Sequence, residues 1–188
     1  MSNIVEQIRK CKKCDLCKNQ APLVEKCKNC DVMWVGLSAK QVGNYKDAVP
    51  LDKSTNTGKV IAEIESRNEN VQYYRTNVVK CAPLDNEGKL RYPTREELSI
   101  CMNNLQSEIS NLKPKVVFLL GGLAQEAVER KYKVKFKKKK DLFEYEPVVL
   151  ENTCFFAIEH PSYMTIYKRK HIEDYKKAVV RTIESVIN

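Results

Sequence analysis

Cysteines are the residues of this sequence with the clearest capacity for chemistry, and the chain contains eight of them. Cys11 and Cys14 form a CxxC pair, and Cys27 and Cys30 repeat this spacing after twelve intervening residues. Closely spaced thiolates bind zinc or an iron–sulfur cluster, whereas structural disulfides are rare in reducing compartments. Because the chain has no run of 18 apolar residues and no signal-peptide pattern, we expect a cytoplasmic protein without a membrane anchor. Its cysteines are therefore predicted to bind a metal.

The charge of the chain indicates a polyanionic partner. Lysine and arginine number 33 against 24 acidic residues, which gives a formal net charge of +9. Long-range attraction is then toward nucleic acid or an acidic membrane surface. A composition rich in lysine and asparagine also follows from the base composition of a genome, so the charge alone selects no partner. The lysine run 137–140 is predicted as a solvated loop, with phosphate contact as the alternative.

Alternating strands and helices must position these residues. Strands are predicted from apolar runs, which are typical of parallel sheets buried on both faces, at 31–37, 73–79, 116–120, 148–150 and 154–158. Helices are predicted from apolar periodicity at 57–66 with Thr57 as N-cap, from a Thr94–Glu97 capping box to 112, and at 123–130 and 171–187. We expect an α/β protein, a three-layer α/β/α sandwich with a central four-stranded, mostly parallel sheet. Residues 1–188 are predicted to form one domain, to which a metal pins the cysteine-rich segment 1–30.

Three short segments follow three of the predicted strands at their carboxyl ends. They are GLSAKQ at 36–41, NVVKC at 77–81 and HPS at 160–162. Ligands bind outside the carboxyl ends of the strands in open α/β sheets. We therefore expect the three segments to line one site.

These segments, taken together, resemble the uracil-DNA glycosylases, and most closely their iron–sulfur branch, family 4. That branch carries an early CxxCxL, a TNxVKC strand end, an acidic residue followed by cysteine on a helix, an LGxxA turn and HPxY. The chain has the corresponding motifs in the same order, at 11–16, 76–81, 97–101, 120–124 and 160–163. The resemblance covers nearly the whole chain, and it implies a protein that excises uracil from DNA by hydrolysing the N-glycosidic bond.

The resemblance assigns roles to individual residues. Asn77 would read the O4 and N3–H edge of a flipped uracil through its side-chain amide. His160 would donate a hydrogen bond to uracil O2 as negative charge develops on the leaving base. Ser162 would contact a phosphate, and Met164 would fill the gap that the flipped base leaves. Further residues expected to line the substrate site are Gly36, Leu37, Ser38 and Leu51.

The acidic positions of the first motif differ from the family pattern. Leu37 and Gln41 stand where family members carry acidic residues that position water or stabilise the cationic sugar. Gln41 is the third candidate catalytic residue because an amide can orient water, but it cannot carry the negative charge. Asp47 and Asp52 are nearby in the sequence, and either could substitute.

The stacking position also differs. The family has a proline–phenylalanine pair whose aromatic ring stacks on uracil, and this chain has Pro50 and Leu51 instead. The stacking face is then lost unless Tyr45 supplies it. Either the pocket works poorly or it has another ligand.

Two sets of cysteines compete for the metal. The resemblance implies a 4Fe-4S cluster on Cys11, Cys14, Cys81 and Cys101. Four thiolates also suit structural zinc, and the rival set Cys11, Cys14, Cys27 and Cys30 has the spacing of a zinc ribbon. Cys30 precedes the first strand whereas Cys81 ends a neighbouring parallel strand, so about 15–20 Å should separate them and one site cannot use both pairs. We favour the set with Cys81 and Cys101, in which Cys17 could replace Cys11, and we expect the metal to be structural.

Three functions remain open. The first is a monomeric glycosylase that acts on uracil-containing DNA, which Asn77 and His160 favour. The second is a degenerate relative without turnover that serves as a DNA-binding module or engages a protein partner or inhibitor, which Leu37, Gln41 and Leu51 favour. The third is a zinc-ribbon protein whose α/β domain has an unrelated ligand. We favour the glycosylase.

Overall fold

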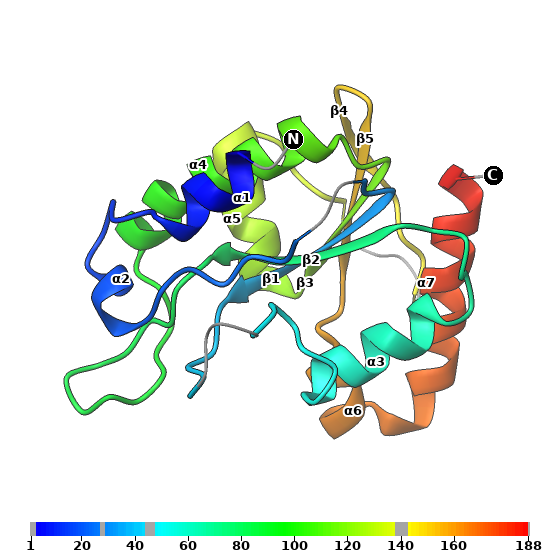
Figure 1. The fold of residues 1–188 in the computed structure, drawn as a ribbon. Helices are drawn as coiled ribbons and strands as arrows, with labels where there is room; N and C mark the ends of the chain where they lie inside the picture. The colour runs from blue at the N-terminus through cyan, green and yellow to red at the C-terminus, as the bar shows by residue number, and fades with distance from the viewer. Residues whose placement is uncertain (1–2, 27–28, 44–47, 138–142, 188) are drawn as a thin grey trace.

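The computed structural model describes residues 3–26, 29–43, 48–137 and 143–187 (Figure 1). Several residues named above lie outside these ranges, namely Cys27, Tyr45, Asp47 and 138–140 of the lysine run. Among the described residues, no helix has both the length and the apolar character needed to cross a membrane.

A five-stranded sheet with the order β2-β1-β3-β5-β4 forms the centre of the protein. Its parallel strands are β1 (Val32–Ser38), β2 (Tyr73–Val79), β3 (Val116–Leu120) and β5 (Thr153–Ile158). The predicted α/β fold with a mostly parallel sheet is confirmed. The number of strands differs from the expected four because β4 (Val148–Leu150) adds an antiparallel edge to β5. The turn between β4 and β5 contains Glu151 at φ 53°, a conformation that suits a tight hairpin.

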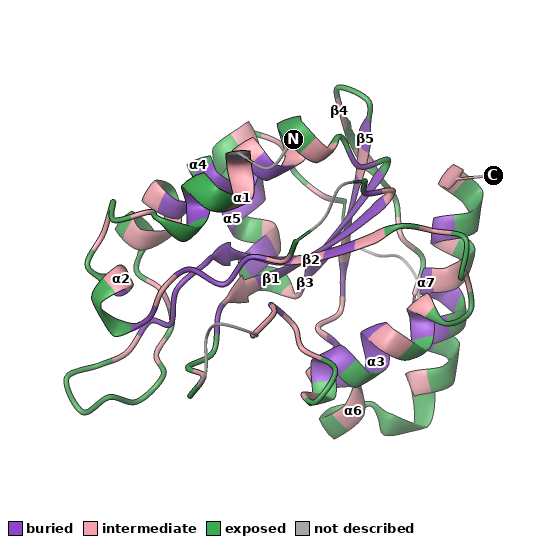
Figure 2. Ribbon diagram, in the orientation of Figure 1, coloured by how far each residue is buried: buried purple, intermediate pink, exposed green. Residues whose placement is uncertain are grey.

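Helices cover both faces of the sheet (Figure 1). One face carries α1 (Asn3–Arg9), α4 (Arg95–Leu112) and α5 (Gly122–Tyr132), with the short α2 (Leu16–Asn19) beside them. The other face carries α3 (Asn56–Glu65), α6 (Pro161–Tyr167) and α7 (Ile172–Ile187), with the 3-10 turn η1 (Arg169–His171) between α6 and α7. Because both faces are covered, the central strands β1 and β3 are almost entirely buried (Figure 2). This arrangement explains their continuous apolar sequences.

Helix caps fix where the elements near the carboxyl ends of the strands begin. Thr94 forms the predicted capping box with Glu97, so that α4 begins where expected. The prediction of Thr57 as the cap of α3 is wrong. Thr55 is extended, and its hydroxyl accepts the Gly58 N–H at 3.0 Å, so Thr55 is the cap. Thr57 is the second residue of the helix, where its hydroxyl is available to another partner.

Candidate functional site

The strand register brings the three predicted segments to the same end of the sheet, at the carboxyl ends of its strands. Gly36 pairs with Asn77, and Leu120 pairs with Ile158 two residues before His160. Three strand spacings separate β2 from β5, which corresponds to about 14 Å between their backbones. Asn77 and His160 therefore lie on opposite sides of the same carboxyl-end face.

Asn77 has a buried side chain with an unused acceptor. The residue is 2% exposed, and its Oδ1 has no hydrogen-bond partner among the described residues. A Cβ atom on Gly36 would lie 2.3 Å from that oxygen and 3.0 Å from Leu51 Cδ2. Gly36, Leu51 and Asn77 are thus in contact. Leaving a buried acceptor unpaired costs about 1–3 kcal/mol, and a hydrogen-bond donor on a ligand would remove that cost.

Contacts of its main chain fix the position of Leu51. It has a left-handed φ of 52°, and its carbonyl accepts a hydrogen bond from Arg75 Nη1 at 3.1 Å. Arg75 forms an ion pair with Glu65, which fixes the guanidinium. A Cβ on Gly58 would lie 2.5 Å from the Leu51 carbonyl oxygen, so the loop before α3 depends on this glycine. The predicted pocket residue therefore has a fixed position, and it presents an aliphatic face rather than an aromatic one.

His160 ends the loop after β5 and caps α6. Its Nδ1 accepts the Ser162 N–H at 3.2 Å, so in the neutral ring the proton is on Nε2. Burial, and secondly the charge of Lys40, lower the pKa of His160 below its ordinary value of 6.5. The ring is consequently a neutral donor at physiological pH. Gly121, at φ 85°, packs against it, since a Cβ there would lie 3.1 Å from His160 Cβ.

Ser162 forms a hydrogen bond with a residue of α3. Its hydroxyl lies 2.7 Å from that of Thr57, which joins the beginning of α6 to the beginning of α3. Ser162 is half-buried. Thr57 could not be predicted as its partner from the sequence, because the two residues are 105 positions apart.

The prediction of Met164 as an exposed wedge is wrong. Met164 is 1% exposed and packs in the core between the sheet and the helices α3 and α7. The short helix α6 turns this side chain inward and leaves three others in solvent. The exposed side chains are Tyr163, Ile166 and Tyr167, at 45%, 60% and 72%. Exposed basic residues of η1 follow them directly.

Gln41 lies in the loop after β1, beyond the half-buried Leu37 and Ser38. The side chain of Gln20 holds this loop from both sides, since it donates to the Lys40 carbonyl at 3.1 Å and accepts from the Val42 N–H at 2.9 Å. The Gln41 side chain itself is exposed. Gln20 was not recognised from the sequence because its role depends on contacts about 20 residues away.

A cavity of about 390 Å³ lies beside His160, at the carboxyl ends of β3 and β5. Its lining residues are Gly121, Gly122, Gln125, Ala157, Ile158, Glu159, His160 and Tyr163. Asn77 is not among them. The cavity therefore lies on the His160 side of the carboxyl-end face. On the other side, Asn77 contacts Gly36 and Leu51.

Asp52 is the described acid that adjoins the Leu51 corner. The side-chain hydroxyl and the N–H of Ser54 hydrogen-bond to its carboxylate and hold its pKa below the usual value of 3.8. Asp52 is therefore ionised at neutral pH. It is half-buried, so its charge is partly screened by solvent.

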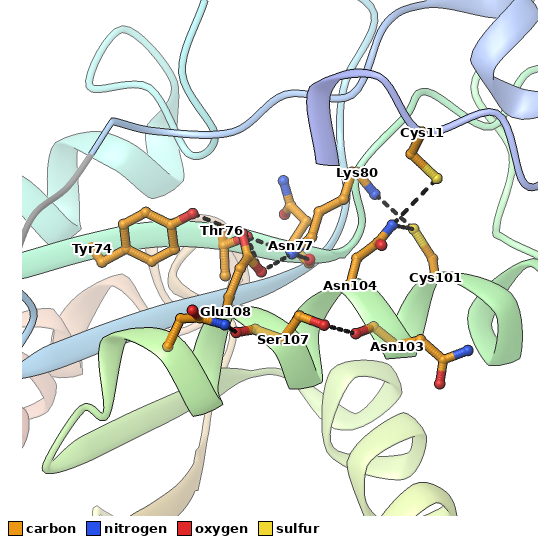
Figure 3. Close-up of polar contacts among 11 residues, drawn as sticks. Cys11, Tyr74, Thr76, Asn77, Lys80, Cys101, Asn103, Asn104, Ser107 and Glu108 are labelled. Carbon is orange, nitrogen blue, oxygen red and sulfur yellow. Dashed lines mark hydrogen bonds and ion pairs between the residues drawn. The ribbon is translucent and has the colours of Figure 1, made fainter. Parts of the chain in front are cut away.

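The favoured set of cysteines gathers between the N-terminal segment, β2 and α4. Burial is the main cause that raises the pKa of the Cys81 thiol, and further causes are the nearby thiols of Cys101, Cys14, Cys11 and Cys17. Asn104 Nδ2 lies 3.6 Å from Cys11 Sγ and 3.8 Å from Cys101 Sγ, and the Lys80 N–H donates to Cys101 Sγ at 3.4 Å (Figure 3). Donors aimed at sulfur suit thiolates that ligate a cluster.

Cys30 is remote from this group. Val32 pairs with Tyr73 and Ser38 with Val79, so Cys30 precedes the amino end of the strands whereas Cys81 follows the carboxyl end. Within the described part of the chain, no three Cys, His, Asp or Glu side chains are placed to hold a single metal ion.

Comparisons with known proteins identify the family. The pattern of the Uracil DNA glycosylase superfamily matches residues 27–184. A Type-4 uracil-DNA glycosylase of Archaeoglobus fulgidus is 28% identical over 190 residues, which cover 94% of this chain and 90% of the relative. A Type-4 uracil-DNA glycosylase of Pyrobaculum aerophilum is 31% identical over 132 residues, or 68% of this chain and 64% of the relative. The crystal structure of Pedobacter heparinus SMUG2 has the same fold, with a TM-score of 0.58 at 13% identity, over 84% of this chain and 76% of that chain. The chain belongs to the uracil DNA glycosylase superfamily.

Proposed function

We propose that this protein excises uracil from DNA by hydrolysing the N-glycosidic bond. The observation that carries the proposal is the buried, unpaired Oδ1 of Asn77 on the same face as a neutral His160. Uracil offers the N3–H that this oxygen lacks, and its O4 would accept from the amide nitrogen of Asn77. Both hydrogen bonds require a base that is flipped out of the duplex.

His160 would stabilise the leaving base. Its Nε2–H would donate to uracil O2 as the glycosidic bond breaks and charge moves onto the ring. One such preoriented donor contributes about 3 kcal/mol, or 10²- to 10³-fold in rate. The bond from the Ser162 N–H to Nδ1 supports this role because it keeps the proton on Nε2.

The protein surface around α6 supports DNA as the partner. Lys168, Arg169 and Lys170 are exposed and add to a net charge of +9. The neighbouring exposed rings of Tyr163 and Tyr167 lie 5.4 Å apart and offer an apolar edge for the minor groove. We infer that these rings take the wedge role that Met164 cannot, and that Ser162 contacts a phosphate.

Turnover is expected to be slow. Gln41 can orient the attacking water, but neither it nor Leu37 supplies the negative charge that a cationic sugar favours. Asp52 is ionised and borders the Leu51 corner, so it is the described residue best placed to supply part of that charge. The exposed Gln41 and the aliphatic Leu51 favour a second candidate function, a binding protein that recognises uracil-containing DNA without cleaving it.

Cys11, Cys14, Cys81 and Cys101 would hold a 4Fe-4S cluster, whereas the described thiols are not placed to hold a single zinc ion. The residues fit such a group because their thiols gather around Cys81 and receive N–H donors from Lys80 and Asn104. The group would be structural, since it would join the N-terminal segment to β2 and α4 within a single domain. Free thiols of this kind suit a reducing cytoplasm. An absorbance band near roughly 400 nm in protein purified without oxygen would support the cluster, whereas colourless protein that contains zinc would reject it.

A cleavage assay with a labelled uracil oligonucleotide, followed by alkali, tests the proposed activity. With enzyme in excess, we expect strand breaks at uracil and none in the matched thymine oligonucleotide, and His160→Ala should lower the rate about 10²-fold or more. Tight binding to uracil-containing DNA without strand breaks would instead establish the binding protein.

A further inference from the structure

A completely buried ion pair lies behind Asn77, and none of the steps above uses it. Lys80, just after β2, contacts Glu108 of α4, and both side chains are 0% exposed (Figure 3). Replacing a buried pair by apolar side chains is often neutral or stabilising, because desolvation offsets the attraction between the charges. Stability alone therefore gives no reason for the pair to be here.

Every donor of the ammonium is used. Lys80 Nζ donates to the Thr76 hydroxyl at 2.6 Å, to the Asn77 carbonyl at 2.5 Å and to the Glu108 carboxylate. Glu108 in turn accepts the Tyr74 hydroxyl at 2.7 Å and the Thr76 hydroxyl at 3.1 Å. A network in which each polar group has a partner is rigid, so the position of the ammonium is fixed.

The Asn77 carbonyl is the part of this network that belongs to a predicted site residue. β2 is at the edge of the sheet, so its outer side has no neighbouring strand to pair with. Lys80 supplies the missing donor for Asn77, as Glu25 supplies an acceptor for the Arg75 N–H at 2.7 Å. The outward-facing carbonyl of Asn77 is therefore held by a side chain, whereas the inner side of β2 pairs with β1. Its amide has little freedom to move, because Oδ1 is already against Gly36.

The main chain of Lys80 contacts the cysteine group, which is made of Cys11, Cys14, Cys81 and Cys101. Its own N–H donates to Cys101 Sγ, and Asn104 joins Cys101 to Cys11. One residue thus connects the cysteine group, the α4 carboxylate and the main chain of Asn77.

We propose that Lys80 is a positioning residue, which holds the Asn77 peptide through Glu108 and Cys101 so that the buried amide faces the base. This inference rests on the proposed reading of uracil by Asn77.

The test separates positioning from stability. Lys80→Met alone would leave the Glu108 charge buried without an opposite charge and could unfold the protein. The main variant is therefore Lys80→Met combined with Glu108→Gln, which removes both charges and keeps an acceptor for Tyr74 and Thr76. Its control is Val179→Ala, a core truncation in α7 on the opposite face of the sheet. Dissociation constants are measured for an oligonucleotide with 2′-fluorinated deoxyuridine, which resists hydrolysis, and for its thymine counterpart, together with thermal unfolding.

We expect the double variant to unfold no lower than the control and to lose about tenfold or more of its preference for uracil, while Val179→Ala keeps the preference. A folded double variant with the wild-type preference would overturn the inference. Wild-type protein without any preference would overturn the proposed base reading as well.

A milder pair of variants decides the matter if the double variant does not fold. Thr76→Val removes the hydroxyl that accepts from Lys80 Nζ and keeps the shape of the side chain, whereas Thr76→Ser keeps the hydroxyl. The inference predicts that Thr76→Val lowers the preference for uracil several-fold and that Thr76→Ser retains it. Equal preference in both variants would contradict the positioning role.

Discussion

Gly36→Ala is the substitution whose effect on base recognition follows most directly from the structure. The new methyl group would lie 2.3 Å from Asn77 Oδ1, which is well inside van der Waals contact, and 3.0 Å from Leu51 Cδ2. Lys80 holds the Asn77 main chain, so the side-chain amide has to rotate away. Losing two hydrogen bonds to the base edge, at about 1 to 1.5 kcal/mol each, lowers the affinity for uracil by about 2 to 3 kcal/mol, or about 30- to 150-fold.

The assay compares binding and single-turnover excision for uracil and thymine oligonucleotides. Gly43→Ala is the matched control because a methyl group there meets no atom within 4 Å. Overpacking at position 36 is also expected to lower the free energy of unfolding by about 1 to 3 kcal/mol, so unfolding is measured in parallel. If Gly36→Ala folds and retains the wild-type preference for uracil within twofold, the placement of the base against Asn77 is refuted.

Three further predictions concern the rest of the site. The folded protein holds the pKa of His160 below 6.5, so the unfolded chain binds more protons in the pH window below that value. The free energy of unfolding should therefore fall as pH falls through this window. A His160→Gln variant, measured by urea titration, should lack that part of the pH dependence. Met164→Ala should lower the free energy of unfolding by about 2–5 kcal/mol and leave the DNA affinity of the folded protein unchanged. Tyr167→Ala should instead weaken DNA binding and leave the free energy of unfolding unchanged. The reverse result would restore Met164 as the wedge. Leu51→Phe should raise uracil affinity by about 0.5–1.5 kcal/mol through ring stacking, and no change in the dissociation constant would show that position 51 does not face the base.

The sequence predicts the parts of the fold that depend on continuous apolar runs. The buried runs of β1, β2 and β3, together with the polar segments that follow strands, were sufficient to predict a parallel sheet with a site at its carboxyl edge. β4 was predicted as a strand, but its place as a fifth, antiparallel strand depends on the turn at Glu151 and on pairing with β5. Met164 was misplaced because the inward face of a seven-residue helix is decided by packing against α3 and α7.

Long-range polar contacts explain most of what the sequence did not reveal. Thr57 meets Ser162, and Lys80 meets Glu108, across 105 and 28 positions respectively. Neither pair has a local spacing that would mark it. The unpaired oxygen of Asn77 likewise becomes visible only when the neighbours of the side chain are known.

Release of free uracil would show whether this protein is a glycosylase. Protein in excess over a uracil-containing oligonucleotide is incubated, and free base and abasic DNA are quantified by mass spectrometry for the wild type and for Asn77→Ala and His160→Ala. We predict stoichiometric release of uracil by the wild type at a slow rate, with both variants at least about 10²-fold slower. Intact DNA after prolonged incubation with excess wild-type protein would contradict the claim that this protein is a glycosylase.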